Sequence, residues 1–174
     1  MVNSQILFSS GINHLGYGVV GTNITKALHN KTKVCLFPIG QVQVTDEDTK
    51  KIIQEQVNNC LSADFDAASV KIWHQNQLIE HASRKKSYAF PIFELDKFTN
   101  LEKMSLRAAD HLIVTSKWAQ EIIKQETDID AYVCPLGVDR KIFHEGKSTE
   151  NNTYQFFTIG KLEYRKGHDF IVRC

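Results

Sequence analysis

HLIVTSKWAQEIIKQETDIDAYVC, residues 111–134, is the stretch that decides the fold class. Its start, His111–Thr115, predicts a buried strand, and its end, Ala131–Cys134, predicts another, stopped by Pro135. Between them Ser116 can begin a helix, because its hydroxyl can accept a hydrogen bond from a backbone N–H of the first turn. The helix would present three apolar residues on one side: Trp118, Ile122 and Ile123. The stretch therefore predicts a strand–helix–strand unit.

The same alternation runs through the chain before this unit. Apolar runs predict four earlier strands: Ile6–Phe8, Val34–Phe37, Ser69–Trp73 and Ser87–Phe93. Helical spacing predicts three helices, around residues 20–28, from Thr45 onward, and around Phe98–Ala108. Continuous apolar strands alternating with amphipathic helices predict an α/β fold. We expect a Rossmann-like open, mostly parallel sheet with helices on both faces.

Composition places the chain among ordinary soluble globular proteins. Of its 174 residues, 42% are hydrophobic and 24% charged, and the net charge is +1. This charge gives no footprint for nucleic acid, and no stretch has the roughly 18–20 apolar residues that span a bilayer. Residues 1–10 lack a basic flank followed by an apolar run, so we expect no signal peptide. The four cysteines are widely spaced without a CxxC pair, which is typical of a cytoplasmic protein with reduced thiols.

The order of segments predicts one domain and the beginning of another. We expect residues 1–144 to form a Rossmann-like domain and the polar residues 145–153 to form a linker. Tyr154–Ile159 predicts a strand, and Gly160–Gly167 predicts a basic turn leading into a helix. A βαβ unit needs a partner strand, so residues 154–174 are expected to be the truncated start of a second domain.

The strand expected over residues 154–159 would present an unpaired edge, which proteins usually hide. Three outcomes are open: disorder, folding back onto the first domain, or pairing with a second copy of the chain to form a homodimer.

Gly16-Tyr17-Gly18-Val19-Val20-Gly21 has the GxGxxG pattern between a strand and a helix. Its glycines would let backbone N–H groups approach a phosphate at the start of the helix. A nicotinamide site needs a tight turn and an acid at the end of the second strand. Here the loop after Phe8 is long and the first acid after that strand is Asp46, so the nicotinamide interpretation is rejected. The pattern indicates either a loop near another phosphate or a flexible glycine loop without a ligand.

Polar residues follow four of the predicted strands, at the edge where ligands bind in an open α/β sheet. They are His74, then Glu94 and Asp96, then Ser116, and finally Gly137 and Asp139. Each has a structural explanation by itself, such as ending a strand or, for Asp96 and Ser116, capping a helix. Their recurrence on one rim indicates a ligand site.

Lys161, Arg165 and Lys166 follow the last predicted strand and precede a helix. Three cations beside a helix start are suited to holding a diphosphate. The alternative is a solvated cluster of charges in a turn.

Three segments together resemble the family 4 glycosyltransferases. Residues 109–118, Ala-Asp-His-Leu-Ile-Val-Thr-Ser-Lys-Trp, resemble the family segment in which "aD" precedes an apolar strand ending in Ser. Residues 134–143 resemble its P-x-G-V-D-x-x-x-F segment. Residues 157–167 resemble the G-R-L-x-x-x-K-G segment that opens the second domain, with Lys161 in place of the usual Arg.

The resemblance implies two Rossmann-like domains facing across a cleft (the GT-B arrangement), with no metal and no cofactor beyond a nucleotide-diphosphate sugar used as donor. It implies these donor-binding residues: Gly16, Gly18, Lys161, Arg165 and Lys166. It implies these acceptor-binding residues: Tyr17, His74, Glu94, Asp96, Ser116, Gly137 and Asp139. It implies catalytic roles for His74, Glu94, Lys161 and Lys166.

The resulting hypothesis is the acceptor-side domain of a retaining glycosyltransferase, which transfers a sugar from a nucleotide-sugar donor to a carbohydrate or other hydroxyl acceptor. We expect the chain alone to be inactive, because the family's Glu-x7-Glu segment would lie beyond Cys174. Two alternatives stay open: a binding module or subunit of a split glycosyltransferase, and an unrelated α/β nucleotide-binding protein. Peripheral membrane association of the parent protein also stays open.

Overall fold

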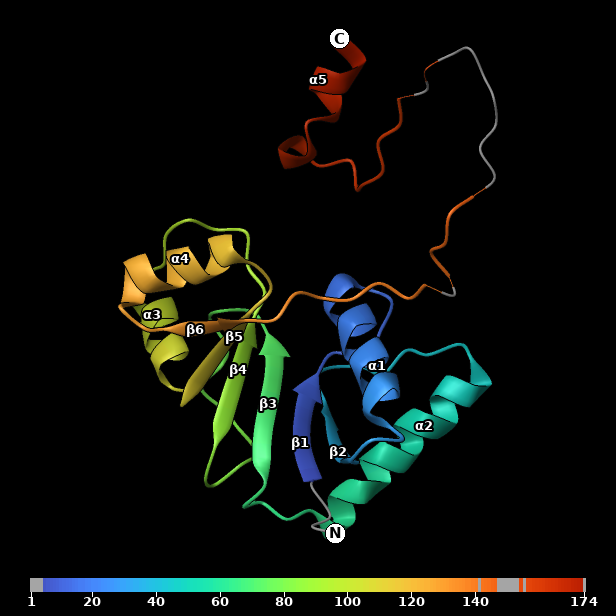
Figure 1. Ribbon diagram of the computed structural model, residues 1–174, viewed down its shortest axis with the longest axis vertical. Coiled ribbons are helices and arrows are strands. Elements are labelled where there is room, and N and C mark those ends of the chain that lie inside the picture. Colours follow the sequence, from blue (N-terminus) through green and yellow to red (C-terminus); the bar gives the residue numbers. More distant parts are fainter. Residues whose placement is uncertain (1–4, 141, 147–153, 155, 174) are drawn as a thin grey trace. The chain divides into compact units, whose positions relative to one another are not determined.

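The computed structural model describes residues 5–140, 142–146, 154 and 156–173 (Figure 1). Its strands are β1 (Gln5–Ser10), β2 (Lys33–Pro38), β3 (Ala68–Trp73), β4 (Ser87–Pro91), β5 (His111–Val114) and β6 (Ala131–Val133). Its α-helices are α1 (Gly16–Leu28), α2 (Glu47–Asn58), α3 (Asn100–Arg107), α4 (Lys117–Thr127) and α5 (His168–Arg173), with short 3-10 helices η1 (Asn59–Ser62) and η2 (Tyr164–Lys166). The chain divides into two compact units, Met1–Gly137 and Val138–Cys174.

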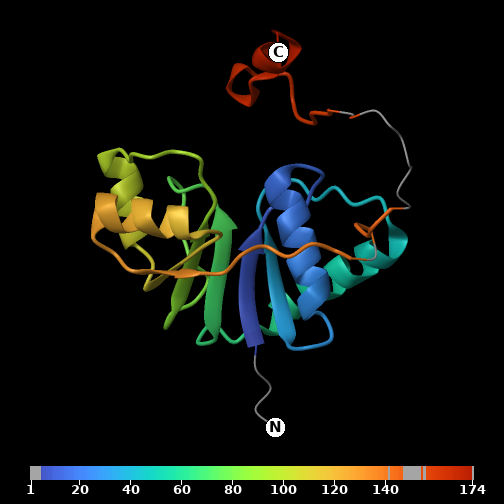
Figure 2. The same ribbon diagram turned by 45° about the horizontal axis from the view of Figure 1, so that its top comes forward.

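The first unit holds one six-stranded sheet in the order β2-β1-β3-β4-β5-β6, and every pairing is parallel. The α/β fold with an open Rossmann-like sheet is therefore confirmed. Figure 2 shows the row of strands with α1 on the near side of β1 and β2. Because all strands run the same way, their carboxyl ends share one edge of the sheet.

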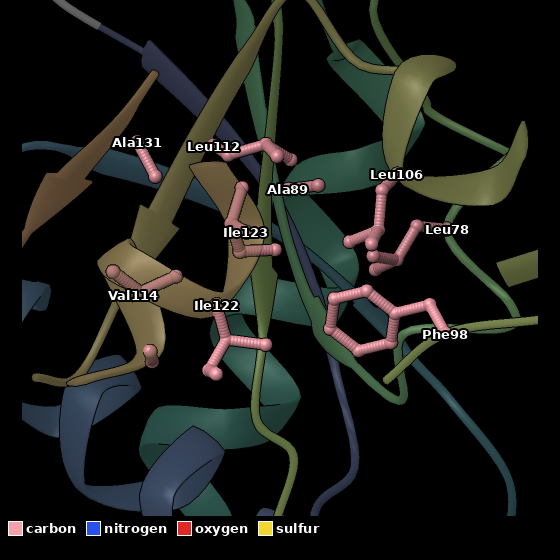
Figure 3. Packing of buried hydrophobic residues seen from close by; sticks show 10 residues of the cluster. Leu78, Ala89, Phe98, Leu106, Leu112, Val114, Ile122, Ile123 and Ala131 are labelled. Atoms are coloured by element: carbon pink, nitrogen blue, oxygen red, sulfur yellow. The ribbon is translucent and has the colours of Figure 1, made fainter. Parts of the chain in front are cut away.

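One hydrophobic cluster lies between α3, α4 and the strands β4, β5 and β6. Successive residues of a strand point to opposite faces, so Ala89 and Phe90 of β4 serve different clusters. Figure 3 shows Leu78, Phe98 and Leu106 lying together in this first cluster. Leu78 comes from the loop after β3, which anchors that loop in the core.

The second cluster lies on the opposite face, under α1. Phe8 of β1, Leu36 of β2 and Ile72 of β3 are buried there. Ile24 of α1 and Ile53 of α2 pack against the same cluster. The sheet is therefore covered on both faces, as the continuous apolar strands predicted.

Helix caps explain where three helices begin. Ser116 caps α4 as predicted, because its Oγ accepts from Ala119 N at 3.2 Å. The predicted start at Thr45 is one residue early, since Asp46 is the cap of α2 and its Oδ2 accepts from Thr49 N at 2.8 Å. Asp96 does not cap the next helix. Thr99 caps α3 through a reciprocal capping box with Glu102.

The second unit agrees in part with the sequence-based expectation. Tyr154 and residues 156–159 do not form the predicted strand, and residue 155 lies outside the described residues. The basic turn leading into a helix is present as η2 followed by α5. Of the expected linker 145–153, residues 147–153 lie outside the described part, so the linker and the boundary after residue 144 stay predictions. Homodimer formation also stays a prediction.

Across the described ranges, no helix combines the length and apolar character that crossing a bilayer requires.

Asp110 joins the ends of two strands, and its loss is expected to lower the thermal stability. Its Oδ2 accepts from Ser87 N and from Ser87 Oγ, both at 2.8 Å, and these bonds hold the pKa of the carboxyl below its ordinary value. A lowered pKa adds stability above the unfolded-state pKa of about 3.9, and this stability is lost as the pH falls through the folded-state pKa. Asp110→Ala should therefore lower Tm near neutral pH, and the difference from wild type should shrink in acid.

Melting curves followed by circular dichroism from neutral pH down to about pH 3 would measure this, a range that includes the unfolded-state carboxyl pKa of about 3.9. Asp130→Asn is the control, because the Asp130 side chain is 91% exposed and pairs with Lys124, which is itself 48% exposed, and such surface ion pairs contribute little. A Tm difference for Asp110→Ala that is constant across the whole range would contradict the assignment.

Candidate functional site

Three elements bring four side chains together at the carboxyl edge of the sheet. Tyr17 lies in the first turn of α1, Trp73 ends β3 and His74 follows it, and Glu94 follows β4. Because β1, β3 and β4 are neighbours, the segments that leave their carboxyl ends are neighbours too. We call Tyr17, Trp73, His74 and Glu94 the carboxyl-edge cluster.

The Tyr17 hydroxyl connects α1 to the segments that follow β3 and β4. Tyr17 Oη donates to the Ile92 carbonyl oxygen at 2.6 Å, and it lies 3.0 Å from His74 Nδ1. The ring centroids of Tyr17 and His74 are 4.4 Å apart. These contacts hold an exposed imidazole in one orientation.

The hydrogen bonds also determine the tautomer of neutral His74. The single hydroxyl proton of Tyr17 goes to Ile92 O, so Tyr17 Oη can only accept from His74. His74 Nδ1 must then carry a proton, which leaves Nε2 as the acceptor nitrogen of the neutral ring. Because the His74 side chain is exposed, this nitrogen can accept a hydrogen bond from a ligand hydroxyl.

The environment keeps Tyr17 protonated. Burial, and after it the negative charge of Glu94, raises the pKa of the Tyr17 phenol above its ordinary value. The phenol therefore remains a donor to Ile92 O through the neutral range. Glu94 itself is exposed, and its charge acts on the Tyr17 phenol.

Trp73 packs against two other members of the cluster. Its ring centroid lies 5.5 Å from that of Tyr17 and 5.4 Å from that of His74. Its indole Nε1 donates to Gln77 Oε1 at 2.7 Å, which fixes the plane of the ring. A Cβ placed on Gly11 would come within 3.3 Å of the Trp73 ring, so a glycine there leaves room for the indole.

The GxGxxG glycines lie inside α1 rather than in a long loop. Since β1 ends at Ser10 and α1 begins at Gly16, the expectation of a long loop is wrong. A Cβ on Gly18 would overlap Asn13, and one on Gly21 would overlap Gly11 and Ser10. These two glycines let the helix pack closely on the chain leaving β1, whereas the space around Gly16 is open. The glycines at these two positions of the pattern are therefore explained by packing.

The other predicted site residues are not part of the carboxyl-edge cluster. Asp96 is exposed in the loop before α3, and Gly137 is exposed after β6. Ser116 is half-buried and occupied as a helix cap. Asp139 is exposed and belongs to the second unit.

The three basic residues predicted to hold a diphosphate all belong to the second unit. Lys161 and Lys166 are exposed, and Arg165 lies in η2. His168 Nε2 lies 3.0 Å from Lys161 O, which closes the turn between them. Their roles toward a donor stay predictions.

Sequence reasoning missed a groove beside the cluster. It has a volume of about 440 Å³ and is lined by Lys71, Trp73, Asn76, Gln77 and Glu80, among others. The only signal in the sequence was the alternation in β3, which places Lys71 and Trp73 on the same face. A larger hollow, of about 700 Å³, lies against α2 and contains no member of the cluster. We do not take this larger hollow as the candidate site, because Tyr17, His74 and Glu94 do not line it.

Within the described residues, no group of three or more His, Cys, Asp or Glu side chains is arranged to hold a metal ion. No protein-family model, no curated protein and no solved structure matches the chain.

Proposed function

We propose that the chain forms the acceptor-binding side of a nucleotide-sugar-dependent glycosyltransferase. The carboxyl-edge cluster binds the hydroxyl acceptor. The donor diphosphate is held by Lys161 and Lys166 in the second unit, a part of the proposal that rests on the sequence resemblance alone.

The observation that supports this function best is the orientation of His74. Tyr17 Oη accepts from His74 Nδ1, so Nε2 can accept a hydrogen bond from an acceptor hydroxyl. Glu94 adds a carboxylate on the same edge, which can bind a second hydroxyl. An imidazole and a carboxylate at the carboxyl edge suit an uncharged polyhydroxy ligand better than a phosphate, which a carboxylate repels.

Binding by the purified chain tests the proposal directly. We would titrate the ¹⁵N-labelled chain with simple sugars and disaccharides and follow backbone amide shifts. The expected result is a shift at Tyr17, His74 and Glu94 with at least one sugar. Calorimetry with UDP, GDP and ADP should show only weak binding, and a tight complex with any of them would instead support a nucleotide-binding protein. Measurable sugar transfer by the chain alone would contradict the expectation that it needs a donor domain.

Tyr17→Phe should remove the hydrogen bond that selects the tautomer of His74, while the contacts between the two rings remain. Without the hydroxyl, Nδ1 loses its acceptor and Ile92 O loses its donor. We expect the imidazole to populate both tautomers and the protein to lose about 1–2 kcal/mol of stability, the cost of an unsatisfied partly buried acceptor. Long-range ¹H–¹⁵N correlation spectra of the histidine rings report the tautomer.

Tyr88→Phe is the matched control, because Tyr88 stacks on His111 at 4.8 Å, near the amino ends of the strands. It should leave the His74 spectrum unchanged. A His74 ring that stays in the Nδ1–H form in Tyr17→Phe would remove the basis of the proposed role.

A further inference from the structure

The groove beside the carboxyl-edge cluster has a wall that is already ordered. Leu78 is fully buried, and its N–H donates to Ser105 Oγ at 2.8 Å. Gln75 is also buried, and its Nε2 donates to Glu102 Oε1 at 2.8 Å. These two anchors tie the loop after β3 to α3, so the residues between and beyond them are held in place.

The loop residues next to these two anchors line the groove. Asn76, Gln77 and Glu80 line it, together with Trp73 and Lys71 of β3. Trp73 Nε1 donates to Gln77 Oε1 at 2.7 Å, so the indole plane is fixed before any ligand arrives. The groove therefore offers an ordered aromatic surface with amide and charged groups around it, and Ile39 and Ile79 complete its lining.

Lys71 places a buried ammonium group in the groove wall. The residue is only 9% exposed, and its Nζ donates to the Glu80 carbonyl oxygen at 3.1 Å. Among the described residues, no carboxylate forms an ion pair with it within 4.0 Å. An ammonium group has three donors, so Lys71 retains donor capacity for a ligand.

The mixture of groups favours a neutral polyhydroxy ligand. The Glu80 carboxylate lines the same groove and its negative charge acts on Lys71, so a phosphate attracted by the ammonium group would be repelled by the carboxylate. A hydroxyl both donates and accepts, so it can bond to the carboxylate, to the ammonium and to the amides of Asn76 and Gln77. The apolar C–H face of a sugar ring can pack on Trp73. A volume of about 440 Å³ suits one sugar ring and its substituents.

We infer that this groove is a sugar subsite, and that the acceptor is an oligosaccharide of at least two units whose neighbouring unit presents its hydroxyl to His74. Trp73 belongs to both the groove and the carboxyl-edge cluster, since it lines the groove and also packs on Tyr17 and His74. This inference rests on the proposed function for the identity of the reacting hydroxyl, but the binding of sugar in the groove can be tested separately.

The two tryptophans of the chain allow a matched test. Trp73 lines the groove, whereas Trp118 packs on Phe93 at 5.8 Å and does not line it. We would titrate the ¹⁵N-labelled full chain with glucose, mannose, N-acetylglucosamine, maltose, mannobiose and chitobiose, and follow the indole N–H signals. At least one disaccharide should shift the Trp73 signal and leave that of Trp118 unchanged.

Variants then identify the contacts. Trp73→Leu should weaken disaccharide binding about tenfold, through loss of the aromatic surface, and Trp118→Phe should not change it. Lys71→Met is the second variant, because it leaves Trp73, Tyr17 and His74 in place and should also weaken binding several-fold, by loss of a charged hydrogen-bond donor. Thermal melts check that each variant is folded.

The outcomes separate this inference from the proposed function. Shifts at Trp73 without shifts at Tyr17 and His74 would support the groove and overturn the acceptor role of the cluster. Shifts at Tyr17 and His74 without Trp73 would overturn the groove and support the cluster. If no sugar of the panel shifts the Trp73 signal or the Tyr17 and His74 signals, the sugar subsite and the acceptor role of the cluster are both overturned.

Discussion

Gly18→Ala is expected to destabilise the protein by about 3 kcal/mol, the upper part of the range for inserting a methyl group where there is no room. An added Cβ would overlap the backbone N and O and the side-chain Oδ1 of Asn13. The backbone atoms cannot rotate away, so either α1 or the loop before it must shift. That loop is held because Asn13 Oδ1 accepts from Leu15 N at 2.9 Å, and the substitution disturbs this bond as well.

Gly16→Ala is the matched control in the same helix. No atom lies within 4 Å of a Cβ at this position, so the substitution meets no obstacle. Replacing a helical glycine by alanine should leave stability unchanged or raise it by up to about 1 kcal/mol. Urea unfolding of both variants measures the difference. Equal stabilities for the two variants would mean that α1 does not pack on the loop as described.

Leu106→Ala has the second large expected effect, a loss of about 2–5 kcal/mol. Leu106 is fully buried on α3 and packs with Leu78 and Phe98 (Figure 3). Truncation removes this buried surface and leaves a cavity that its neighbours fill only in part. Because Leu78 anchors the loop that walls the groove, the variant should also broaden the indole signal of Trp73.

Leu101→Ala on the same helix is the control. Its side chain is 62% exposed, so truncation should change stability by no more than about 0.5 kcal/mol. Calorimetric or urea unfolding of the two variants gives the comparison. A loss at Leu101 as large as that at Leu106 would show that α3 presents a different face to the core.

Apolar spacing and cap residues predicted most helices and strands of the first unit, because helices and strands are specified mainly by residues close together in the sequence. Ser116 was predicted as a cap and is one, since the hydroxyl and the N–H it binds lie three residues apart. The capping box of Thr99 and Glu102 was missed in favour of Asp96, although Thr-x-x-Glu was present in the sequence. The strand predicted over residues 154–159 was wrong for the described residues, because an apolar run needs strands beside it to become part of a sheet.

The candidate site could be predicted only in part. The rule that ligands bind at the carboxyl ends of strands indicated His74 and Glu94, and the sheet order makes the strands that they follow neighbours. The sequence could not show that Tyr17 bonds to His74 and to the Ile92 carbonyl oxygen, because these partners are 57 and 75 residues away. The same rule also indicated Ser116 and Gly137, which the structure does not place in the cluster.

The sequence by itself determined the alternation of strands and helices in residues 111–134 and before them, and with it the parallel α/β class. Period and capping are properties of short stretches, so no distant contact is needed to specify them. The tertiary structure decided the order β2-β1-β3-β4-β5-β6, the tautomer of His74 and the groove beside Trp73. Each of these depends on contacts between residues far apart in the chain, and such contacts arise only once the sheet has assembled and its two faces are covered.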